Sequence, residues 1–139
     1  MYLVDTDVLS ALRKPRRNAN LVAWLAGAPE DGLYLSVITV GEITKGIAKV
    51  RRAGSEQSMA DADALQSWLE SVLAHFSQRI LPVTVPVATR WGRLCDLHPE
   101  LPTDMLIAAT ALENGLTVAT RNVVHFGRAG VPVVNPFDR

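Results

Sequence analysis

Short apolar runs alternate with amphipathic stretches along the chain, and this alternation predicts strands separated by helices. The clearest helical pattern lies in residues 62–77, where large apolar side chains recur every three or four residues and form one continuous stripe. Strands are expected where apolar residues follow one another without interruption: Tyr2–Asp5, Leu33–Ile38, Ile80–Val83, Leu116–Thr120 and Val131–Val134.

The segments between these runs have helical patterns, and proline or glycine limits several of them. The predicted helices span residues 6–14, 20–28, 39–53, 62–77, 86–98 and 104–114. Strands separated by helices indicate a parallel sheet covered on both faces. The predicted fold class is therefore α/β, a three-layer sandwich with a central parallel sheet of four to five short strands.

Amino-acid composition indicates the size and the cellular location of the protein more than its function. The 139 residues suit one domain spanning residues 1–139, and 14 basic residues balance 14 acidic ones, so any RNA-binding surface must be a local patch. Cys95 is the single cysteine, which rules out an internal disulfide and favours a reducing, cytoplasmic location. No apolar run reaches about 18 residues, so neither membrane insertion nor secretion is expected.

Acidic and amide side chains follow the predicted strands at one edge of the sheet. Asp5 ends the first strand, Glu42 lies in the predicted first turn of the helix after the second strand, and Asn122 follows the strand at 116–120. Asp104 opens the helix that leads into that strand. Ligands of open α/β sheets bind at the carboxyl ends of the strands, so these four residues are the candidate catalytic group.

Three carboxylates at one edge would repel one another, and a divalent cation would remove that repulsion. Oxygen ligands suit Mg²⁺, with Mn²⁺ as the alternative, and no paired His and Cys stand at zinc spacing. Asp5, Glu42 and Asp104 are the expected metal ligands.

Each acidic residue also has a simpler interpretation as a helix-end residue. Asp5 and Asp7 suit helix N-caps, and Asp104 suits the positive end of a helix macrodipole. Thr39 and Glu42 have the spacing of a capping box. Their coincidence at one edge favours a site over four separate caps.

The same segments resemble the motifs of PIN-domain ribonucleases of the VapC and FitB type. The matching segments, in chain order, are Leu3–Leu9, Leu35–Glu42, Pro102–Ala111, Val118–Asn122 with Phe126, and Val134–Phe137. The resemblance implies a PIN-like fold and an endoribonuclease that uses Mg²⁺ or Mn²⁺ held by Asp5, Glu42 and Asp104. It also implies a toxin that forms a homodimer and is inhibited by a VapB-like antitoxin encoded beside it.

The chain departs from the family pattern after the strand at 116–120. A fourth acid often stands at position 122 or three residues later, and here those positions hold Asn122 and His125. One firmly bound metal, with a second arriving with the substrate, is therefore expected. His125 is interpreted as a structural or substrate-contacting residue.

The expected reaction is hydrolysis of RNA phosphodiester bonds by a metal-activated water. Thr6 and Asp7 are expected to support the metal ligands, and Lys45 and Arg121 to contact the substrate backbone. A further basic cluster at residues 13–17 is either a phosphate grip or an ordinary solvated face.

Two other functions remain open on the sequence. Asp5 and Asp7 at a strand end also resemble the nucleophile and general acid of haloacid-dehalogenase phosphatases. Alternatively, Asn122 in place of an acid is compatible with a PIN-like module that binds RNA or a partner with weakened catalysis.

Overall fold

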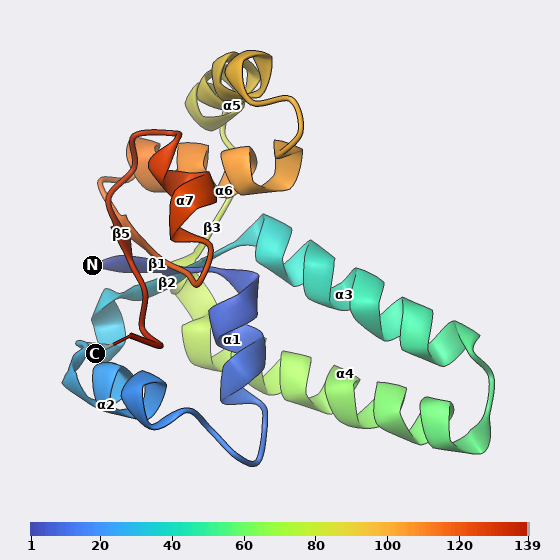
Figure 1. Ribbon diagram of the computed structural model, residues 1–139. Coiled ribbons are helices and arrows are strands. Elements are labelled where there is room, and N and C mark those ends of the chain that lie inside the picture. The colour runs from blue at the N-terminus through green and yellow to red at the C-terminus, as the bar shows by residue number, and fades with distance from the viewer. Residues whose placement is uncertain (139) are drawn as a thin grey trace.

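A parallel sheet organises the chain, whose residues 1–138 are described by a computed structural model (Figure 1). Within these residues the sheet has five strands in the order β3-β2-β1-β4-β5, and each neighbouring pair is parallel. The strands are β1 (Tyr2–Val4), β2 (Leu33–Ser36), β3 (Ile80–Leu81), β4 (Thr117–Ala119) and β5 (Val133–Val134). The predicted α/β class and strand number are confirmed.

Helices connect the strands and lie on both sides of the sheet. They are α1 (Thr6–Leu12), α2 (Ala19–Gly27), α3 (Val37–Arg52), α4 (Glu56–Phe76), α5 (Val85–Leu97), α6 (Pro102–Glu113) and α7 (Val123–Gly127). Helices α3 and α4 lie side by side and extend away from the sheet (Figure 1). None of the helices in residues 1–138 is both long and apolar enough to cross a bilayer.

Two hydrophobic cores lie on opposite faces of the sheet because side chains alternate along a strand. In β1, Leu3 packs into the core formed with α6 and α7, whereas Val4 packs into the core formed with α1 to α4. In β2, Leu35 joins the second of these cores and Tyr34 the first. The buried central strand β1 therefore holds its carboxyl end rigidly between the two layers.

The start of α3 differs from the prediction. The expected strand 33–38 ends at Ser36, and the expected helix 39–53 already begins at Val37. The reason is the Ser36 side chain, whose oxygen accepts a hydrogen bond of 3.0 Å from the Ile38 backbone N–H and so caps the helix. The β-branched residues Val37 and Ile38 suggested a strand, but this cap decides the local conformation.

Two other helices were not fully anticipated. Helix α4 begins at Glu56, whereas the sequence pattern predicted a start at Ala62. The pattern missed the first turns because they are largely exposed and carry no apolar stripe. Its cap is Ser55, which accepts from the Ser58 N–H at 3.0 Å. Helix α7 has five residues, too few for a periodic signal. By contrast, Gly115 ends α6 with a φ of 65°, as predicted.

Candidate active site

Asp5 occupies the junction between the central strand β1 and helix α1. It caps α1, because its Oδ1 accepts from the Thr6 N–H at 2.8 Å, while its Oδ2 accepts from the Thr120 hydroxyl at 2.9 Å. Only 5% of the residue is exposed. The capping interpretation is thus correct for Asp5, but it coexists with a buried carboxyl group at the active edge.

Burial, followed by the negative charge of Asp7, raises the pKa of Asp5 to about 7. The charge of Asp104 adds to this effect, and the hydrogen bonds from Thr120 and Thr6 oppose it without cancelling it. A positive charge beside this carboxyl group would stabilise its ionised form and so offset the cost of burial. Perturbed pKa values of this kind are concentrated at functional sites.

Glu42 lies on the neighbouring helix α3 and is joined to the site by a hydrogen bond with Thr6. The Thr6 hydroxyl donates to Oε1 of Glu42 at 2.7 Å and lies 3.4 Å from the hydroxyl of buried Thr39. Since α3 begins at Val37, Glu42 lies in its second turn and cannot form the capping box expected with Thr39. The Thr6 side chain, which we expected to support a metal ligand, is therefore bonded to Glu42.

Asp104 lies in the first turn of α6 and faces the short helix α7. Its Oδ2 is 2.9 Å from Nδ1 of His125, and the two side chains are 23% and 42% exposed. The interaction with Asp5 places Asp104 within electrostatic range of the first carboxylate. Sequence reasoning treated His125 as structural or substrate-contacting and did not assign it this partner.

The segment after β4 closes the site. The Asn122 backbone N–H donates to the Thr120 hydroxyl oxygen at 2.9 Å, while the Asn122 side chain is exposed. Asp7 accepts from the backbone N–H groups of Val8 at 2.7 Å and Arg121 at 3.0 Å. Asp7 therefore fixes this loop to α1 and is poorly disposed to act as a general acid.

The predicted basic contacts are arranged differently from one another. Lys45 is exposed on α3, on the turn after Glu42. The Arg121 guanidinium instead lies over the Phe137 ring, 3.7 Å from its centroid. Arg13 shares a pocket of about 260 Å³ with Thr6 and Glu42, which makes it the member of the 13–17 cluster that adjoins the site.

The predicted ligands converge only in part. Asp5 interacts with Asp104, and Glu42 is joined to Thr6, the residue next to Asp5. Among residues 1–138, no three His, Cys, Asp or Glu side chains lie close enough together to hold a metal ion. The described side chains thus form an acidic edge rather than a complete three-carboxylate cage.

Thr120 is the site residue that the sequence pattern does not single out. Its hydroxyl is fully buried and links Asp5 to the loop after β4. Its place at the end of a predicted strand could have identified it, because ligands of parallel sheets bind at the carboxyl ends of the strands and Asp5 was chosen on that ground.

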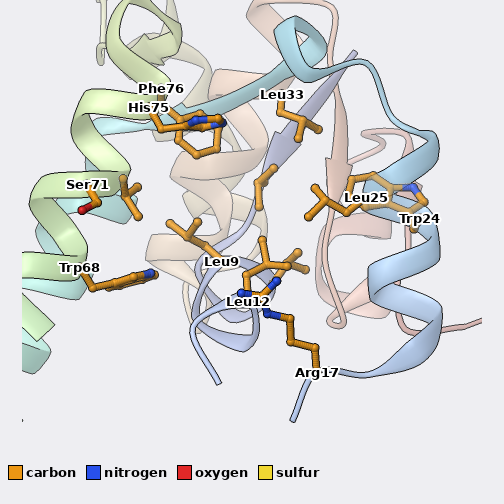
Figure 2. A pocket seen from close by; sticks show the side chains of 13 residues that line it. Leu9, Leu12, Arg17, Trp24, Leu25, Leu33, Trp68, Ser71, His75 and Phe76 are labelled. Atoms are coloured by element: carbon orange, nitrogen blue, oxygen red, sulfur yellow. The ribbon is translucent and has the colours of Figure 1, made fainter. Parts of the chain in front are cut away.

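A separate apolar cavity of about 300 Å³ lies away from the acidic edge, between α1, α2 and α4 (Figure 2). Leu9, Leu12 and Phe76 line it together with Trp24 and Trp68, and Arg17 lies at its border (Figure 2). The aromatic residues thus border a hydrophobic hollow and the core. Cys95 is half-buried and lies outside this cavity.

Comparison with protein families decides between the candidate folds. The family described as "PIN domain" matches residues 2–130. The chain belongs to the PIN-domain family. This match replaces the haloacid-dehalogenase alternative, and the motifs quoted from the sequence fall within or beside the matched range.

Curated relatives of this PIN domain carry toxin and ribonuclease names. Toxin FitB of Neisseria gonorrhoeae is 37% identical over 143 residues, covering 99% of each chain. VapC ribonuclease Y4jK of Sinorhizobium fredii is 33% identical over 147 residues, again covering 99% of both. The resemblance to the VapC and FitB branch is confirmed.

Solved structures agree with the sequence relatives. The crystal structure of FitAcB from Neisseria gonorrhoeae has a TM-score of 0.86 and 36% identity, covering 100% of both chains. A toxin-antitoxin complex from Klebsiella pneumoniae has a TM-score of 0.67 and 28% identity, also covering 100% of both. The PIN-like fold expected from the sequence is therefore confirmed.

Proposed function

We propose that this PIN domain is an endoribonuclease toxin that hydrolyses RNA phosphodiester bonds with a divalent cation, and that a small antitoxin binds and inhibits it. The relatives named as VapC ribonuclease and toxin support the reaction class. The observation that carries the site is the buried Asp5 carboxyl, whose pKa is raised to about 7 at the carboxyl edge of the sheet.

Asp5 and Asp104 are the residues that would hold the cation, with Glu42 as the third ligand. Mg²⁺ is usually held by one or two carboxylates together with waters and substrate phosphates, so the pair Asp5 and Asp104 fits it in donor chemistry. The electrostatics at Asp5 also suit a cation, because its positive charge would offset the repulsion that Asp5 experiences from Asp7 and Asp104. Mg²⁺ is proposed ahead of Mn²⁺, which accepts the same oxygens.

When bound, the cation supplies positive charge at the scissile phosphate. The chain itself supplies orientation. Two hydrogen bonds, from the Thr6 N–H and the Thr120 hydroxyl, fix both oxygens of Asp5, and the Thr6 hydroxyl fixes Glu42. Such pre-organisation removes the cost of ordering these groups when RNA binds.

The RNA backbone needs positive charge beside this acidic edge. Lys45 is exposed on α3, and Arg13 lines the pocket that contains Thr6 and Glu42. We assign these two residues to phosphates that flank the scissile bond. Arg121 contributes its backbone N–H to Asp7, and its stacked guanidinium is the weaker candidate for a substrate contact.

The proposed partners follow from the relatives. A toxin-antitoxin complex among the solved structures supports a small antitoxin for this chain. A homodimer and a cytoplasmic location stay predictions from the resemblance and from the single cysteine.

A binding module with weakened catalysis is the second candidate, and Asn122 is the observation that favours it. Its exposed amide stands where the family resemblance led us to expect an acid, and it brings no charge to the site. The protein would then bind RNA without cutting it.

One assay separates the two candidates. Purified chain is incubated with structured RNA in Mg²⁺, in Mn²⁺ or in EDTA, beside the Asp5→Asn and Asp104→Asn variants. Cleavage that needs the cation and both carboxylates supports the nuclease. RNA binding without cation-dependent cleavage would favour the binding module, and cleavage in EDTA or by both variants at the wild-type rate would refute the assigned site.

A further inference from the structure

Helix α7 is anchored more firmly than its five residues suggest. Phe126 is fully buried in the core that contains Leu3, Ile107 and Val118. Its backbone N–H also donates to the Asn122 carbonyl at 3.3 Å. The neighbouring His125 is therefore presented to the site by a fixed backbone, although its own side chain is 42% exposed.

The loop that leads into α7 contacts the first carboxylate. The Thr120 hydroxyl donates to Asp5 and accepts from the Asn122 N–H, each at 2.9 Å. At the far end of the same segment, Nδ1 of His125 is 2.9 Å from Oδ2 of Asp104. Residues 120–125 thus connect the two carboxylates that interact electrostatically.

The contact with His125 involves one carboxylate oxygen of Asp104 and leaves the other oxygen available to a ligand. Among the described residues, Oδ1 of Asp104 has no hydrogen-bond partner, whereas Oδ2 lies 2.9 Å from Nδ1 of His125. Carboxylates that bind metals are themselves commonly hydrogen-bonded, and removal of such partners typically costs metal affinity or activity. The arrangement at Asp104 has this form.

We propose that His125 is a positioning residue that holds the Asp104 carboxylate, through Nδ1–H and Oδ2, with its second oxygen directed to the cation shared with Asp5. This inference rests on the proposed function. The residue acts through Asp104 rather than on RNA.

Cation binding without RNA tests the proposal directly. Mn²⁺ is titrated at one fixed pH, and the rise in melting temperature gives an apparent Kd for wild type, His125→Ala and His125→Asn. The Asn amide can donate from about the position of Nδ1, so His125→Asn should bind within a few-fold of wild type. His125→Ala should bind about 10–100-fold more weakly. Val124→Ala, a change of an exposed residue on the same helix, should bind like wild type.

RNA cleavage provides the second measurement. If His125 only positions Asp104, raising the Mn²⁺ concentration should restore most of the His125→Ala cleavage rate. Unchanged Mn²⁺ affinity in His125→Ala would overturn the inference, as would a cleavage defect that persists at saturating Mn²⁺. Should His125→Ala not fold, failure of His125→Asn to bind Mn²⁺ more tightly than Asp104→Asn would also overturn it.

The Asp variants distinguish failure of this inference from failure of the proposed function. Loss of Mn²⁺ binding in Asp5→Asn and Asp104→Asn, with normal binding in His125→Ala, would refute only the role of His125. Wild-type Mn²⁺ binding in both Asp variants would refute the proposed metal site itself.

Discussion

The Thr120 hydroxyl donates a 2.9 Å hydrogen bond to Oδ2 of Asp5, and the two residues are 115 positions apart in the sequence. Both groups are buried, and the same hydroxyl oxygen accepts from the Asn122 N–H. The ends of two neighbouring strands, β1 and β4, are therefore joined by side chains as well as by the backbone ladder.

Thr120→Val should destabilise the protein, because it preserves the side-chain shape but leaves an oxygen of Asp5 and the Asn122 N–H without this partner. An unsatisfied buried polar group costs about 1–3 kcal/mol. Urea unfolding at pH 8, where Asp5 is largely ionised, would measure the difference. Thr120→Ser retains the hydroxyl and serves as the control, and equal stability of the Val and Ser variants would contradict the prediction.

The raised pKa of Asp5 makes the metal-free protein less stable as pH rises. The folded pKa of about 7 lies above the ordinary Asp value of 3.8, so between these values the unfolded state releases a proton that the folded state keeps. The contribution of Asp5 to stability is greatest below pH 3.8, falls through this window by up to about 1.4 kcal/mol per pH unit, and levels off above pH 7.

Asp5→Asn tests this effect, because it removes the one carboxyl group whose pKa is raised. Melting temperatures measured in EDTA from pH 5 to pH 8 should fall more steeply for wild type than for Asp5→Asn. Asp5→Asn should be the more stable protein at pH 8 and inactive on RNA. Parallel pH profiles would show that Asp5 titrates normally in the folded state.

Thr6→Val should lower RNA cleavage while changing stability little. It removes the 2.7 Å hydrogen bond to Oε1 of Glu42 but keeps the Thr6 backbone N–H that bonds to Asp5. A hydrogen bond contributes about 0.5–1.5 kcal/mol net, which corresponds to roughly a 2–10-fold loss in rate. Thr6→Ser keeps the hydroxyl and should retain activity. A Thr6→Val enzyme as active as Thr6→Ser would show that Glu42 needs no support from Thr6.

Phe126→Ala should destabilise the whole domain, because the ring is fully buried between α7 and the sheet. Truncation of a buried Phe to Ala typically costs 3–5 kcal/mol, and chemical denaturation would measure it. Val124→Ala is the matched change on the exposed side of α7 and should have little effect. A small cost at Phe126 would mean that α7 is not tied to the core.

The sequence predicted the framework better than the contacts within it. Apolar runs located the strands, because these depend on periodicity. The rule that ligands bind at the carboxyl ends of parallel strands predicted that Asp5, Glu42 and Asp104 converge, and the structure brings them together only in part. Periodicity could not locate the start of α3, since the Ser36 cap outweighs the strand preference of Val37 and Ile38. It also could not find α7, which is shorter than two turns.

Side-chain pairings between distant segments were beyond the sequence pattern. Whether Glu42 bonds to Thr39 or Thr6 depends on where α3 begins and how α1 packs against it. The pairing of His125 with Asp104 depends on Phe126 anchoring α7. For Glu42 a local rule supplied a reasonable partner and tertiary packing supplied another, whereas for His125 no local rule supplied a partner.

The central place of β1 bears on how a cell can make this chain. Strand β1 leaves the ribosome before its neighbour β4, which is formed by residues 117–119, and domains fold as units. Asp5 therefore lacks its partner Thr120 until the ribosome has added the 115 residues that separate them. A ribosome synthesising this protein carries no assembled nuclease site until β4 has joined the sheet beside β1.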